Sequence, residues 1–121
     1  MKSYELSFGT IFIIRNNLAE VIAKEAILMD EIKVVELHDF LLDNLEPPFS
    51  LLVNKKHSYS YTFQAQRKIA HLKGLHALAI VIGTSGALMS TETLLNVNGN
   101  IYKNIQVFQD REKALVWLNN N

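Results

Sequence analysis

The sequence predicts a single α/β domain, residues 1–121, in which helices cover a mixed β-sheet. The aliphatic run Leu78-Ala79-Ile80-Val81-Ile82-Gly83 has no polar residue at its centre, which is typical of a strand buried on both faces. Two β-branched and aromatic stretches flank Asn16-Asn17, a pair that suits a tight hairpin. Beyond Asp30, helical and strand patterns alternate, which favours parallel strands. We therefore expect an N-terminal antiparallel hairpin, then parallel strands, and about four helices.

Composition limits the classes of function. The length suits one compact domain, and 49% of the residues are hydrophobic, so a core is available. Twelve acidic and twelve basic residues balance, whereas a polyanion-binding protein normally has a basic excess. The absence of cysteine excludes disulfides and thiolate metal sites. With no signal-peptide pattern and no apolar stretch long enough to span a bilayer, we expect a soluble cytoplasmic protein.

The N-terminal quarter has the patterns of antiparallel strands. Apolar residues alternate with polar ones from Tyr4 to Phe8, and Gly9 is a candidate bulge or bend. Thr10–Ile14 forms a second strand pattern, and Leu18–Ala23 is expected to return beside it after the Asn16-Asn17 turn.

A helix is expected from Asp30, which is a good N-cap and is followed by an acid in the first turn. One face of this helix carries Val34, Leu37, His38, Leu41 and Leu45. An adjacent apolar stripe contains Ile32, Val35 and Leu42. Together they exceed what one contact with a sheet requires, so we expect the stripe to meet a second element or another subunit.

The middle of the chain alternates between strand and helix. Phe49–Val53 is a buried type of strand, and Ser60 is expected to cap a helix that runs to Leu72 and ends before Gly74. After the aliphatic run, Thr84 or Ser85 is expected to cap a third helix. A last strand over Ile105–Phe108 and a closing helix capped by Asp110 complete the pattern; its buried side is expected to contain Ala114, Leu115, Trp117 and Leu118.

The C-terminal stretch resembles a known family. The residues from Val107 to Leu118 include a phenylalanine, a short acidic link and the pattern Glu112-Lys113-Ala114-Leu115-Val116-Trp117-Leu118. This ending is similar to that of small bacterial STAS-like proteins, the SpoIIAA-like group. The order and spacing of the strand at Leu51–Val53, the helix with Ala65 and Arg67, and the Ala77–Ile82 strand are also similar. These residues belong to a core pattern, so they indicate fold more than function.

The resemblance implies a domain that works by contacting other proteins. In the anti-sigma-factor antagonists of this superfamily, a serine at the start of a helix is phosphorylated, and this switches binding off. The matching region here is Lys55–Thr62, where Ser58 and Ser60 are the candidate phosphoacceptors. The usual Asp-Ser pair and the following glycine are missing. The alternative interpretation is that Ser60 is only an N-cap and Ser58 a loop residue.

Two further stretches are candidate anion sites. Thr84-Ser85-Gly86 follows the aliphatic run and opens a helix, so its backbone N–H groups could hold an anion, although the glycine spacing of a nucleotide loop is absent. A basic rim near the end of the Phe49–Val53 strand is the second candidate, and the alternative is an ordinary solvated surface. The rim would comprise Lys55, Lys56, His57, Arg67 and Lys68.

No catalytic or cofactor motif is present, and the histidines lack metal-ligand spacing. We expect no enzyme, no cofactor, no metal and no nucleic-acid partner. Two classes of function remain. The first is a non-catalytic regulatory or protein-interaction module that binds another protein or itself, as a homodimer, through an exposed apolar patch. The alternative is a carrier of a small apolar, lipid-like ligand, with a cavity near Phe40 and Leu41.

Overall fold

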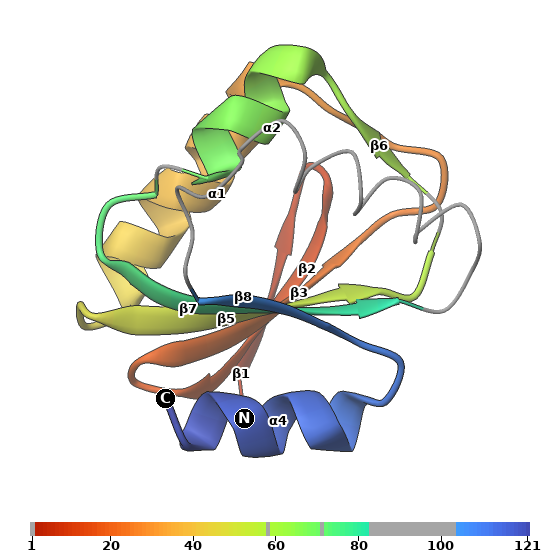
Figure 1. Ribbon diagram of the computed structural model, residues 1–121. Coiled ribbons are helices and arrows are strands. Elements are labelled where there is room, and N and C mark those ends of the chain that lie inside the picture. The colour runs from red at the N-terminus through yellow and green to blue at the C-terminus, as the bar shows by residue number, and fades with distance from the viewer. Residues whose placement is uncertain (1, 58, 71, 83–103) are drawn as a thin grey trace.

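The computed structural model describes residues 2–57, 59–70, 72–82 and 104–121 (Figure 1). These residues form a six-stranded sheet with the strand order β1-β2-β3-β5-β7-β8, and a separate two-stranded ribbon pairs β4 with β6. The strands are β1 (Lys2–Leu6), β2 (Gly9–Arg15), β3 (Leu18–Ala23), β4 (Leu28–Met29), β5 (Phe49–Lys55), β6 (Ser60–Tyr61), β7 (Leu75–Ile82) and β8 (Ile105–Phe108). The helices are α1 (Glu31–Asn44), α2 (Phe63–Ala70) and α4 (Arg111–Asn119).

The first three strands form an antiparallel meander. β2 pairs with β1 on one side and with β3 on the other, and Arg15 lies opposite Leu18 across the Asn16-Asn17 turn. The predicted hairpin is therefore confirmed. Gly9 is the first residue of β2, and a Cβ atom at this position would lie 2.2 Å from the carbonyl oxygen of Ile22. The close approach of two strands, and not a bulge, requires the glycine.

The remaining strands are parallel. β3 pairs with β5, β5 with β7, and β7 with β8. The predicted aliphatic strand is β7, one strand in from the β8 edge, and its two faces enter different clusters. Leu78 and Ile80 belong to one core cluster, whereas Ala79 and Val81 belong to the other. The expectation that this strand is covered on both faces is confirmed.

Helices cover both faces of the sheet. In Figure 1, α1 and α2 lie on one face and α4 on the other. The larger cluster joins Val34, Leu37 and Leu41 of α1 to Ala65 and Ile69 of α2. The smaller cluster is closed by α4, whose buried residues are Ala114 and Leu118. Each large aliphatic side chain buried in this way contributes about 1.5–3 kcal/mol.

The expected caps of two helices are confirmed. The side chain of Asp30 accepts a hydrogen bond from the backbone N–H of Lys33 at 3.0 Å, and Asp110 accepts one from Glu112 at 2.8 Å. Each carboxylate satisfies a donor that the first turn of a helix leaves unpaired. Asp30 and Asp110 therefore set the starts of α1 and α4.

The predicted start of α2 was wrong. Ser60 and Tyr61 form β6, which pairs in parallel with β4, and the helix begins only at Phe63. Thr62 replaces Ser60 as the capping residue, since its hydroxyl accepts a hydrogen bond from the N–H of Ala65 at 3.1 Å. Pairing with Leu28 and Met29 holds Ser60 and Tyr61 in an extended conformation. The helix also ends at Ala70, before the predicted Leu72, and Gly74 with φ +88° turns the chain into β7.

Three helices lie within the described residues, compared with the four that the sequence predicts. The expected third helix, which follows Thr84 and Ser85, lies outside the described residues. Among the residues that are described, no helix is both long and apolar enough to cross a membrane.

Candidate functional site

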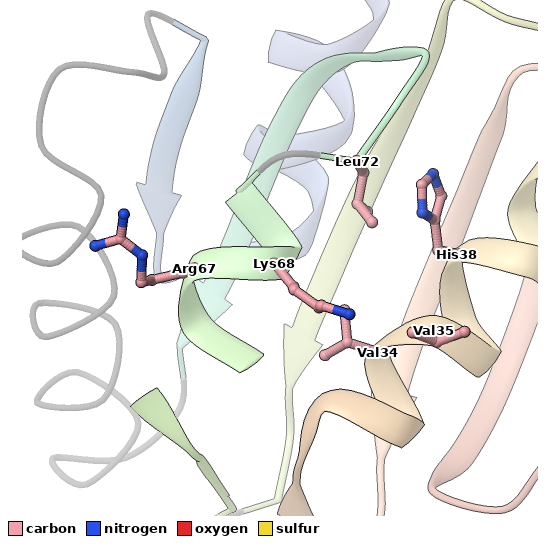
Figure 2. Close-up of a pocket in the computed structure, with 6 residues that line it drawn as sticks. All are labelled: Val34, Val35, His38, Arg67, Lys68 and Leu72. Atoms are coloured by element: carbon pink, nitrogen blue, oxygen red, sulfur yellow. The ribbon is translucent and has the colours of Figure 1, made fainter. Parts of the chain in front are cut away.

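An open groove of about 340 Å³ lies between α1 and α2 (Figure 2). Its lining residues are Val34, Val35, His38, Arg67, Lys68 and Leu72. Val34 and Leu72 are buried members of the core cluster, so the floor of the groove is apolar. The two helices cover the same face of the sheet (Figure 1), and α2 is much shorter than α1.

Basic side chains line the α2 side of the groove. Figure 2 shows Lys68 reaching toward Val34 and Arg67 pointing away from the other labelled residues. The ammonium of Lys68 lies 3.5 Å from a carboxylate oxygen of Glu31, and both side chains are about half exposed. An exposed ion pair of this kind contributes little stability, so the ammonium of Lys68 is available to another carboxylate. The guanidinium of Arg67 lies 6.0 Å from the ring centroid of Phe63.

His38 of α1 also lines the groove. Its Nε2 atom accepts a hydrogen bond from the backbone N–H of Lys73 at 3.2 Å. His38 therefore ties α1 to Lys73 in the segment after α2, and its side chain is half-buried.

The predicted apolar stripe continues from the groove along α1. Ile32, Val35 and Leu42 are 79%, 42% and 40% exposed, while Val34, Leu37 and Leu41 of the adjacent row are buried. Ile32 also borders two shallow hollows with Glu31, one of which includes Val35 and Lys68. Val35 lines the groove and Ile32 lines the hollow beside it, so the groove and this part of the stripe adjoin. Together with Leu42, the remaining residue of the stripe, they make up the surface that we call the α1–α2 face. It is defined by Ile32, Val35, Leu42, Arg67 and Lys68.

A second unusual environment surrounds Lys55, the last residue of β5. Its side chain is only 1% exposed, and its Nζ atom has no hydrogen-bond acceptor among the described residues. Nζ lies 4.9 Å from the ring centroid of Tyr59 and 5.1 Å from that of Tyr61. Burial lowers the pKa of Lys55 to about 8, because the charged form loses its hydration. The expectation that this lysine lies on a basic rim or on an ordinary solvated surface was therefore wrong.

The opposite face of the sheet contains a paired buried charge. Glu20 of β3 accepts hydrogen bonds from Arg111 at 2.7 and 3.1 Å and from the amide of Asn54 at 2.9 Å. Burial by itself raises the pKa of Glu20, but the hydrogen bonds from Arg111 and Asn54 and the charge of Arg111 outweigh it, so the pKa is below its usual value. The contact between Glu20 and Arg111 was not predicted from the sequence. The one signal was an acid in the centre of the apolar Leu18–Ala23 strand.

The other predicted site residues are not brought together. Ser60 is exposed within β6 and does not lie at a helix start. Ser58 and the Thr84-Ser85-Gly86 stretch lie outside the described residues. The basic rim is divided, since Lys55 is buried, whereas His57 is half-buried and lies 3.7 Å from a carboxylate oxygen of Glu25.

The two residues expected to line a ligand cavity have other roles. Leu41 is completely buried in the main core cluster. Phe40 is half-buried and its ring packs edge-on against Tyr4, with the centroids 5.1 Å apart. Neither residue borders the groove between α1 and α2, so a ligand cavity near Phe40 and Leu41 stays a prediction.

No family model, curated protein or solved structure matches this chain. The mixed sheet, with an antiparallel N-terminal part followed by parallel strands, is compatible with the STAS-like resemblance. The functional proposal therefore rests on the architecture and on the geometry of the site.

Proposed function

We propose that this chain is a non-catalytic protein-interaction module of the STAS-like type, and that its contact surface is the α1–α2 face. The observation that supports this most directly is the exposure of Ile32 and Val35 beside a groove with an apolar floor. Exposed apolar side chains that adjoin a concave surface are typical of interaction sites, whereas isolated ones are common on any protein.

Charge favours a partner with acidic residues. Arg67 and Lys68 lie on the α2 side of the groove, and the one ion pair of Lys68 in the described structure is exposed. A partner carboxylate could therefore displace Glu31 from Lys68 at little cost. Complementary charge of this kind accelerates association and selects partners.

The shape of the groove favours a helical partner. It lies between two helices and continues into the stripe of Ile32, Val35 and Leu42, so an amphipathic helix could place apolar residues along it. We propose an amphipathic helix with a carboxylate near Arg67 and Lys68 as the occupant. It would belong to another protein or to a second copy of this chain. The groove volume also falls within the range of small-molecule sites, but its open, partly basic lining suits a lipid tail poorly.

Affinity capture with matched baits tests the proposed surface. The first bait is wild type, the second is Ile32→Asp/Val35→Asp, and the third is Val116→Asp. Val116 is 60% exposed on α4, on the opposite face of the sheet, and so provides an apolar-to-acid control of similar exposure. We expect the double variant to lose bound protein at least about tenfold, because burying a carboxylate in an apolar contact costs more than about 1.4 kcal/mol of binding free energy. The Val116→Asp bait should retain the bound protein.

Two further measurements identify the partner class. Native mass spectrometry of the same three proteins detects a dimer; its loss only in the Ile32→Asp/Val35→Asp variant would identify a second copy of the chain as the occupant. An Arg67→Glu/Lys68→Glu bait should lose the salt-dependent part of binding. Recovery of the same proteins in the same amounts by all baits would contradict the proposal.

A further inference from the structure

Helix α1 itself has the features that the α1–α2 face requires of an occupant. Its outer side carries the exposed stripe of Ile32, Val35 and Leu42. Asp39 and Asp43 of the same helix are exposed, lie one turn apart, and form no ion pair with another described residue. The helix therefore combines an apolar stripe with two unpaired carboxylates, and the basic residues of α2 lie beside it.

The spacing of the stripe allows it to pack against a copy of itself. Ile32 and Leu42 are ten residues apart, which is about 15 Å along a helix. When a copy of α1 lies antiparallel with its Leu42 against Ile32, two-fold symmetry places its Ile32 against Leu42. The two Val35 side chains then lie on either side of the two-fold axis. All the apolar residues of the stripe are covered in this register.

The same register brings both aspartates of the copy to Lys68. The ammonium of Lys68 lies 3.5 Å from a carboxylate oxygen of Glu31, and Lys68 borders one hollow together with Glu31 and Val35. In the antiparallel pair, Asp39 of the copy lies opposite Val35, and Asp43 of the copy lies opposite Glu31. The ammonium of Lys68 thus meets two carboxylates of the other copy, and two-fold symmetry repeats this contact.

We infer that the occupant of the α1–α2 face is a second copy of this chain, docked as an antiparallel pair of α1 helices in which Lys68 of each copy binds Asp39 and Asp43 of the other. The inference rests on the proposed function, because it uses the same face. Net charge also favours self-association, since twelve acidic and twelve basic residues leave no net charge to keep two copies apart.

Two charge reversals test the register, because each reverses one side of the contact. In Asp39→Lys/Asp43→Lys, the introduced lysines face Lys68 of an identical copy, and in Lys68→Asp the introduced aspartate faces Asp39 and Asp43. Each variant alone should dimerise at least about fivefold more weakly than wild type. In an equimolar mixture the reversed residues of one variant meet opposite charges in the other, so a mixed dimer should form with at least the wild-type affinity.

Sedimentation velocity of the 121-residue chain, over about 1–200 μM, measures the dimer dissociation constant. Native mass spectrometry identifies the mixed dimer, because the two variants differ in mass. The matched control is Glu112→Lys, which reverses an exposed carboxylate of α4 on the opposite face of the sheet (Figure 1) and should leave the dimer unchanged. Glu31→Gln removes the carboxylate that shares Lys68 within the chain, so it should strengthen the dimer about two- to fivefold.

Failure of the inference is distinguishable from failure of the proposed function. The inference is overturned if wild type stays monomeric throughout the concentration range, if the two reversed variants form no mixed dimer, or if Glu31→Gln weakens the dimer. The proposed function survives each of these results when the Ile32→Asp/Val35→Asp bait still loses a protein that the wild-type bait captures. A dimer that persists unchanged in Ile32→Asp/Val35→Asp also overturns the inference, since its contact then lies elsewhere on the chain.

Discussion

Glu20 and Lys55 are two buried ionisable residues on opposite faces of one sheet, and they differ in their hydrogen-bond partners. Glu20 accepts hydrogen bonds from Arg111 and Asn54, which replace the water that burial removes. Lys55 has two aromatic faces and, among the described residues, no acceptor. The comparison teaches that burial alone does not determine the state of an ionisable group. Hydrogen-bond partners stabilise the charge of Glu20, and their absence favours the neutral form of Lys55.

The two faces of the sheet also differ in whether their charged and apolar side chains have partners. On the α4 face, the Glu20–Arg111 pair links β3 to the start of α4 across 91 positions of sequence. On the other face, α1 and α2 leave an apolar stripe and a groove exposed above a core that encloses an unpaired amine. The first arrangement stabilises the fold, and the second leaves an apolar surface exposed.

The largest expected change comes from removing Glu20. The variant Glu20→Ala should lower the free energy of unfolding by about 2–3 kcal/mol at pH 7, because the guanidinium of Arg111 and the amide of Asn54 lose their acceptor. This value lies below that of a fully buried pair, since Arg111 is partly exposed. The matched control is Glu112→Ala, which removes an exposed carboxylate 3.6 Å from the same guanidinium and should change stability by less than about 0.5 kcal/mol. Urea denaturation measures both.

The acid dependence of the Glu20 variant sharpens this prediction. The folded pKa of Glu20 is below the ordinary value of about 4.3, so its contribution is fully present above that pH and is lost as pH falls through the folded pKa. The difference between wild type and Glu20→Ala should therefore shrink below about pH 4. An unchanged difference at low pH would show that packing, and not charge, accounts for the loss.

The second prediction concerns Lys55, whose replacement should raise the free energy of unfolding. Replacing Lys55 by Met should raise the free energy of unfolding by about 1–3 kcal/mol at pH 7, since the desolvated charge disappears and only the contact with the two rings is weakened. Between about pH 8 and 10 the unfolded chain holds a proton that the folded chain has released. Wild-type stability should therefore rise in that window relative to Lys55→Met, and denaturation at pH 7, 8, 9 and 10 tests this. A constant difference across the series would contradict a lowered pKa of Lys55.

The smallest expected effect concerns the exposed stripe. The substitutions Val35→Asp and Val116→Asp should each change the free energy of unfolding by no more than about 0.5–1 kcal/mol, because neither side chain contributes a large part of the core. Thermal denaturation of the two variants gives the comparison directly. A much larger loss for Val35→Asp would mean that the stripe stabilises the fold and is not available to a partner.

Local patterns in the sequence determined most of the elements. The Asp30 and Asp110 caps, the Asn16-Asn17 hairpin and the doubly covered strand at Leu78–Ile82 were all predictable, because capping, turn chemistry and hydrophobic period act over a few residues. The exposure of Ile32, Val35 and Leu42 was also foreseeable from an apolar arc wider than one contact needs.

Tertiary structure decided what lies between elements. Ser60 became a strand residue because β4 lies beside it, which no local signal near Ser60 indicates. Lys55 looked like part of a polar loop, yet β5 extends to it and pairs it with Ile82 of β7, so its side chain enters the core. The partner of Glu20 lies 91 positions away. Local propensity concerns the conformation of a short segment, whereas the burial and pairing of a charge depend on segments that only folding brings together.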